Sequence, residues 1–161
     1  MFTGLFGMMK SFPEAARLIK QAKSKQTKDV LRYTAGSFYM QLVNARGMCL
    51  FGAITSTLPI VDWMNAATGW DLSPDEYLRT GERILSLRKA FNMREGIQPT
   101  DQQLGDRAIG KRHLEKGPLK GKTIDIDNLM REFYDTVGWE LATGGPTPDK
   151  LKALEIDRFI R

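Results

Sequence analysis

Apolar positions recur every three or four residues through most of this chain, and polar capping residues separate the apolar segments. This spacing places apolar side chains on one face of a helix. Ser11, Ser73, Asp125 and Thr147 each precede such a segment, and all four are residue types that cap helix N-termini. The pattern therefore predicts an all-α fold.

The first two predicted helices occupy the N-terminal part of the chain. Ser11-Phe12-Pro13-Glu14 predicts a helix start, with a serine cap, a capping box to Glu14 and proline in the first turn. The lysine-rich residues 23–28 end this helix, and a second helix is predicted over residues 29–45. The predicted apolar positions are Ala15, Leu18, Ile19 and Ala22 in the first, and Val30, Leu31, Phe38, Leu42 and Val43 in the second.

Residues 48–58 follow a break at Gly47 and are apolar on nearly every side. Such a segment is either buried all round or faces something other than water. We therefore expect a groove or self-association at residues 48–63. Pro59 starts a further helical segment that ends at Thr68-Gly69.

Ser73-Pro74-Asp75-Glu76 combines a serine cap, proline at the first helical position and a glutamate that completes a capping box. We predict a helix from there to about Asn92, with Tyr77, Leu78, Ile84, Leu85, Ala90 and Phe91 on its apolar side. Gly36 and Gly81 lie inside predicted helices, where glycine costs about 1 kcal/mol relative to alanine. Both glycines therefore indicate close packing against another segment.

The composition changes at residues 94–123, where Gly, Pro, Asp, Gln and Lys dominate. We predict a long irregular loop, and such loops often contact partners. Asp125 then caps a helix over residues 126–137, with Leu129, Met130, Phe133, Tyr134 and Val137 inward, and Thr147 caps a last helix to about Ile156. No strand pattern is evident, so residues 1–161 are predicted to form a single helical domain.

Composition and charge restrict the classes of function. The 161 residues are 42% hydrophobic, with no apolar run near the ~20 residues that span a bilayer and no basic residue ahead of the apolar N-terminus. One cysteine cannot form an intrachain disulfide, so a cytoplasmic location is expected. The net charge is +5, but the basic residues are not interleaved with aromatic ones. We therefore expect neither nucleic-acid nor membrane binding.

The residues available for catalysis are few. Cys49 is the only cysteine and His113 the only histidine, so the chain alone cannot build a zinc site of the usual kind. Cys49 is either a small buried hydrophobic residue or, with His113, part of a nucleophile pair. There is no phosphate-binding glycine motif. By residue chemistry alone, the chain does not complete an active site.

Four short motifs nevertheless occur in an order and spacing that resemble those of a known protein family. They are Asn44-Ala45-Arg46-Gly47-Met48-Cys49, Gly81–Ile84 continued by Arg88–Gly96, Tyr134 to Trp139, and Pro146–Leu151. Over roughly residues 30–156 the chain resembles the C-terminal helical part of the tungsten- and pterin-dependent aldehyde:ferredoxin oxidoreductases. The first motif resembles that family's DxxGLC sequence, and the second resembles its GERI and REG block.

The resemblance implies a set of cofactor contacts. Cys49 would be the fourth ligand of a 4Fe–4S cluster, and Asn44, Gly47 and Met48 would line a pterin of the tungsten cofactor. The implied reaction is oxidation of an aldehyde to a carboxylic acid, with electrons passing from tungsten through the cluster to ferredoxin. The implied partners are the N-terminal domains or a separate subunit of the same enzyme.

Two departures from the family pattern bear on this interpretation. Asn44 replaces the aspartate of the motif, and the CxxCxxxC sequence that supplies the other cluster ligands is absent from these 161 residues. The chain is thus an excised domain, a product of a split gene or a relative without redox function. We expect the isolated chain to hold no cofactor and to be inactive. The alternative function is a free-standing helical interaction module that binds no metal.

Overall fold

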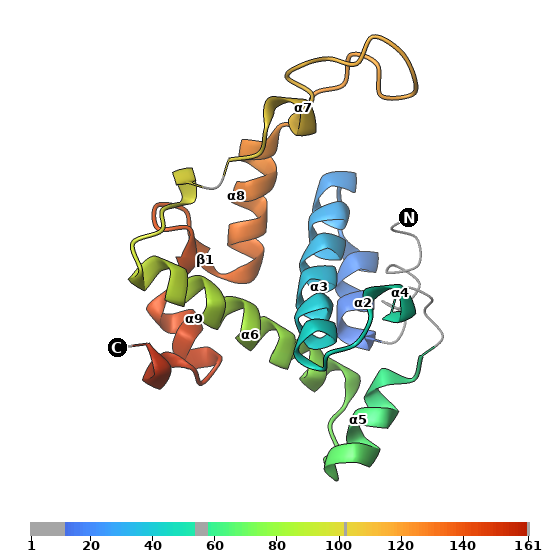
Figure 1. The fold of residues 1–161 in the computed structure, drawn as a ribbon, viewed down its shortest axis with the longest axis vertical. Helices are drawn as coiled ribbons and strands as arrows, with labels where there is room; N and C mark the ends of the chain where they lie inside the picture. Colours follow the sequence, from blue (N-terminus) through green and yellow to red (C-terminus); the bar gives the residue numbers. More distant parts are fainter. Residues whose placement is uncertain (1–11, 54–57, 102, 161) are drawn as a thin grey trace.

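The computed structural model describes residues 12–53, 58–101 and 103–160 and confirms the predicted all-α fold (Figure 1). The α-helices are α2 (Pro13–Gln21), α3 (Lys25–Ala45), α4 (Leu50–Ala53), α5 (Ile60–Thr68), α6 (Pro74–Arg94), α7 (Asp106–Ile109), α8 (Ile126–Val137) and α9 (Pro148–Ala153). Two short 3-10 helices, η2 (Pro99–Asp101) and η3 (Asp157–Phe159), and two strands, β1 (Trp139–Glu140) and β2 (Gly145–Pro146), complete the described elements. None of the helices in these ranges is long and apolar enough to cross a membrane.

Helix α3 is the centre of the fold, because α2, α6 and α8 all pack against it (Figure 1). It meets α6 at Gly81. A Cβ atom at Gly81 would lie 2.1 Å from the backbone oxygen of Phe38, so only glycine permits this contact. The prediction of close packing at Gly81 is confirmed, and Gly36 is also buried.

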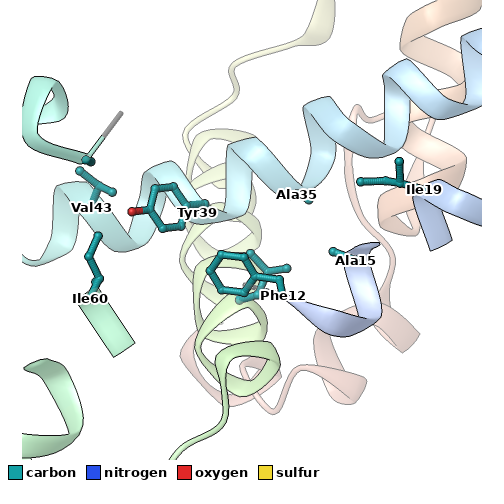
Figure 2. Close-up of a cluster of buried hydrophobic side chains, with 9 residues drawn as sticks. Phe12, Ala15, Ile19, Ala35, Tyr39, Val43 and Ile60 are labelled. Carbon is teal, nitrogen blue, oxygen red and sulfur yellow. The ribbon is translucent and has the colours of Figure 1, made fainter. Parts of the chain in front are cut away.

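Phe38 contacts both hydrophobic clusters of the described chain. The larger cluster, shown in Figure 2, consists of Phe12, Ala15, Ile19, Ala35, Tyr39, Val43, Ala53, Ile60 and Leu78. The smaller cluster consists of Tyr134, Val137 and Trp139, and the ring centres of Tyr134 and Trp139 lie 5.8 Å apart. The crossing of α3 and α6 therefore joins the two cores.

Local capping chemistry explains most helix starts. The capping box at Ser73 is present: the Ser73 amide donates to Glu76 Oε2 at 2.7 Å, and the Glu76 amide donates to Ser73 Oγ at 3.3 Å. Asp125 and Thr147 cap α8 and α9 as predicted. The predicted end of α9 at Ile156 is wrong, because the helix stops at Ala153.

The starts of the first two helices differ from the prediction. α3 begins at Lys25, four residues earlier than expected, because Ser24 Oγ accepts a hydrogen bond from the Thr27 amide at 2.9 Å. The N-cap of α2 is Phe12, and the predicted capping residue Ser11 lies outside the described residues. The Glu14 amide instead donates to the carboxylate of Asp75 on α6, at 3.3 Å to each oxygen.

The predicted loop at residues 94–123 is largely irregular, with η2 and α7 inside it. Beyond α7 the chain projects away from the helices (Figure 1). The antiparallel pair of β1 and β2 was not predicted, because two residues per strand are too few to show an alternating pattern. Leu18, Phe91 and Met130 were predicted to face inward, but their side chains are exposed.

We expect the substitution Gly81→Ala to lower the free energy of unfolding by about 1–3 kcal/mol, because the new methyl group collides with the Phe38 backbone. This loss outweighs the gain of about 1 kcal/mol in helix propensity. Urea denaturation followed by circular dichroism measures it. Gly52→Ala is the matched control, since its Cβ would lie 3.5 Å from the Leu58 side chain, an ordinary contact. Equal stability of Gly81→Ala and the unmodified chain would contradict the close crossing.

Candidate functional site

The Asn44–Cys49 motif forms the turn that ends α3. The Gly47 amide donates to the Asn44 oxygen at 3.1 Å, and the Met48 amide donates to the Val43 oxygen at 3.2 Å. Gly47 has φ +67°, so these two bonds form a Schellman motif with glycine at the left-handed position. The sequence folds this way because glycine adopts that conformation without steric cost.

The structure brings the four predicted cofactor-site residues to this one turn. Asn44, Gly47 and Cys49 are exposed, whereas Met48 is half-buried and packs against the larger cluster. No atom lies within 4 Å of the position that a Cβ would occupy at Gly47. A neighbouring group can therefore approach the backbone of the turn directly.

Cys49 is exposed, which contradicts its interpretation as a small buried hydrophobic residue. Its carbonyl accepts a hydrogen bond from the Ala53 amide at 3.1 Å, so the cysteine stands at the start of α4. Leu50 and Phe51 are 44% and 73% exposed, and the alternative of burial on every side is wrong for this segment. Residues 54–57 of the same apolar stretch lie outside the described residues.

The described residues supply one candidate metal ligand at this turn. No three His, Cys, Asp or Glu side chains gather into a metal site within these ranges. His113 lies in the loop after α7, far from α4 in Figure 1, and its Nε2 lies 2.9 Å from Thr123 Oγ1. The structure does not bring His113 and Cys49 together as a nucleophile pair. An exposed thiol fits the role of one ligand to a cluster whose other ligands come from outside this chain.

The motif residues on α6 have a structural role instead. Glu82 forms an ion pair with Lys150 of α9, and both side chains are mostly buried, with 17% and 23% of their surface exposed. Arg83 Nε donates to the Leu154 oxygen at 2.9 Å, and Arg83 Nη2 lies 2.7 Å from Glu155 Oε2. These contacts fasten α9 to α6. The second and fourth motifs therefore hold each other in place.

A groove with a volume of about 500 Å³ lies beside the C-terminal end of α3 and includes only residues 58–62 of the region 48–63 where a groove was expected. Residues Leu58–Asp62 contribute to it, together with Tyr39 and Arg46 of α3 and its C-cap. Arg46 packs over the Tyr77 ring, with its guanidinium carbon 5.1 Å from the ring centre. Neither Arg46 nor Tyr39 was predicted to belong to a functional site. The sequence signal that could have indicated one was the positively charged Arg46 directly before Gly47 of the first motif.

Comparison with known proteins identifies the family. The family model described as aldehyde ferredoxin oxidoreductase, domains 2 and 3, matches residues 9–156. The chain belongs to the aldehyde ferredoxin oxidoreductase family. It is 32% identical over 120 residues to the tungsten-containing aldehyde ferredoxin oxidoreductase of Pyrococcus abyssi and 34% identical over 125 residues to that of Thermococcus kodakarensis. Each match covers 74% of this chain and 20% of the relative, so the chain spans about a fifth of the length of these enzymes.

Exposure of Cys49 predicts its reactivity in the folded protein. A bulky maleimide should modify one thiol per chain, at a native rate within about 10-fold of the rate in urea, because no opening of the fold is required. Mass spectrometry measures the labelling over time, and Cys49→Ser is the unreactive control. Labelling that requires unfolding would contradict the exposed position and remove the physical basis for a ligand role.

Proposed function

We propose that this chain is the part of an aldehyde ferredoxin oxidoreductase that contributes one wall of the cofactor site. In this proposal Cys49 is a ligand of a 4Fe–4S cluster, and Asn44, Gly47 and Met48 line the pterin of a tungsten cofactor. The enzyme oxidises an aldehyde to a carboxylic acid and passes electrons to ferredoxin. The observation that carries the proposal is the exposed Cys49 on a tight turn inside the region matched by the family model.

Cysteine thiolates are the usual ligands of iron–sulfur clusters, and a 4Fe–4S cluster takes four of them. This chain contains one cysteine, so the remaining ligands belong to another part of the enzyme. The Schellman turn fixes the backbone directly before Cys49 through the Gly47 and Met48 amides, and the Cys49 carbonyl accepts a hydrogen bond from the Ala53 amide. A backbone held in this way loses little further conformational freedom when Cys49 binds, which favours a preformed site.

Asn44, Gly47 and Met48 have distinct roles in this proposal. The exposed Asn44 keeps the carbonyl acceptor of the family's aspartate, lacks its charge and gains an amide donor. Gly47 leaves its backbone open to a flat ring system, since nothing lies within 4 Å of its missing Cβ. Met48 anchors the turn by packing against the larger cluster. When bound, the tungsten cofactor supplies the oxidation chemistry, and these residues bind and orient it.

The test uses the assembled enzyme, in which this chain is combined with the domains or subunit that carry the other cluster ligands. We expect Cys49→Ala to reduce the bound iron and sulfide substantially, because a cluster with three thiolate ligands is less stable. Iron and sulfide analysis with the visible absorption of the cluster measures the loss. Leu50→Ala is the control, since Leu50 is the exposed neighbour.

Unchanged iron content in Cys49→Ala would contradict the ligand role. The same measurement on the isolated 161 residues should give less than one cluster per chain, because only one thiolate is available. An assembled protein that holds no iron at all would favour the alternative function, a helical interaction module. The ion pair between Glu82 and Lys150 suits that alternative, because its role is structural.

A further inference from the structure

The groove beside the turn is a separate feature, independent of Cys49. It is formed by the C-terminal half of α3, the start of α5 and the start of α6. Its volume of about 500 Å³ lies within the range of small-molecule sites, about 300–1,000 Å³. Its apolar lining includes Phe12, Leu42, Leu58, Ile60 and Val61.

Two buried polar atoms of groove-lining residues have no hydrogen-bond partner among the described residues. They are the hydroxyl oxygen of Tyr39, a residue only 2% exposed, and Nη2 of Arg46, whose guanidinium packs over the Tyr77 ring. Figure 2 shows the Tyr39 hydroxyl directed toward the side of the cluster where Val43 and Ile60 lie. A buried polar group without a hydrogen bond costs roughly 1–3 kcal/mol. A bound ligand that accepts these hydrogen bonds would remove that cost.

Two neighbouring polar side chains of the groove, Tyr77 and Asn65, already have partners. Tyr77 Oη donates to Asn65 Oδ1 at 2.8 Å, and Asn65 Nδ2 donates to the Leu72 oxygen at 2.9 Å. The same Asn65 Oδ1 also accepts a hydrogen bond from the Leu72 amide at 3.2 Å. Tyr39 and Arg46 are therefore the side-chain donors that we consider for a ligand, and Asp62 is an acidic group in the same lining.

The two available groups are both hydrogen-bond donors near neutral pH. Burial raises the pKa of Tyr39 to about 12, although the positive charge of Arg46 opposes this shift, so the phenol stays protonated. Burial lowers the pKa of Arg46, and the nearby phenol groups of Tyr39 and Tyr77 act in the opposite direction. An arginine has donors only and stays charged in proteins, so its partner is a hydrogen-bond acceptor, and a negatively charged acceptor binds it more strongly than a neutral one.

We propose that this groove binds a small organic monoanion through its carboxylate, with Arg46 and the Tyr39 hydroxyl as donors and the apolar lining around the rest of the ligand. Asp62 also lines the groove and disfavours a second negative charge, so a monocarboxylate fits better than a phosphate dianion. The proposed site requires no metal. Cys49 does not line the groove, so the proposal does not depend on the role of Cys49 as a cluster ligand.

The test is isothermal titration of the 161-residue chain with benzoate and hexanoate, with the neutral isostere benzamide as the ligand control. We expect saturable binding of the carboxylates and binding of benzamide at least about 10-fold weaker, because charged hydrogen bonds carry the difference. Arg46→Gln should weaken benzoate binding about 10-fold or more, and Tyr39→Phe by a few-fold. Asp62→Asn should strengthen it.

Two controls separate binding from folding. Arg88→Gln removes an exposed arginine on α6 that bonds Gln41, and it should leave benzoate binding unchanged. Circular dichroism should show both variants folded: Tyr39→Phe removes a buried hydroxyl without a hydrogen bond, and Arg46→Gln removes Nη2, which also lacks one, at the cost of the contact with the Tyr77 ring. Cys49→Ser should also bind benzoate normally.

Absence of carboxylate binding, equal binding of benzamide, or full binding by Arg46→Gln would each overturn the proposal. Titration of the assembled enzyme completes the test. Benzoate binding that persists there supports a small-molecule site. Binding that disappears on assembly would show that another part of the enzyme covers the groove, and would overturn the small-molecule proposal.

Discussion

The contact between Gly81 and the Phe38 backbone is the constraint on which the rest of the structure depends. Two long helices cross where one has no side chain, and a methyl group there would lie 2.1 Å from a carbonyl oxygen. Phe38 contacts both hydrophobic clusters, so the same crossing joins the two cores. The close approach fixes α3 relative to α6, and with it the position of the turn at the end of α3.

The motif residues that hold helices together are different from those of the candidate cofactor site. The motif residues Glu82 and Lys150 join α6 to α9 through a partly buried ion pair, which salt screens less than an exposed pair, and Arg83 adds a hydrogen bond to the Leu154 oxygen. Asn44, Gly47 and Cys49 stand exposed at the end of α3, where another domain can reach them. The family motifs thus differ in position: one set holds the helices together, and the other forms an exposed turn that we propose to face the cofactor and another domain.

Capping chemistry is local, and the starts of α6, α8 and α9 could therefore be predicted from Ser73, Asp125 and Thr147. Gly81 was interpretable for a similar reason, since glycine inside a helix needs a packing explanation. The features that were missed depend on distant residues. Asp75 caps the first turn of α2 from another helix, and the groove around Arg46 forms only when α3, α5 and α6 meet. The exposure of Cys49 could not be predicted from the sequence either. Apolar neighbours do not show whether a side chain is buried within this chain or is left for another domain to cover.

The role proposed for Cys49 is tested most directly by an experimental structure of the assembled enzyme, with anomalous scattering recorded at the iron absorption edge. We expect an iron peak within bonding distance of Cys49 Sγ, with the Gly47 turn and the crossing of α3 and α6 unchanged. Iron peaks that all lie away from Cys49, or a Cys49 side chain that contacts only protein atoms, would contradict it.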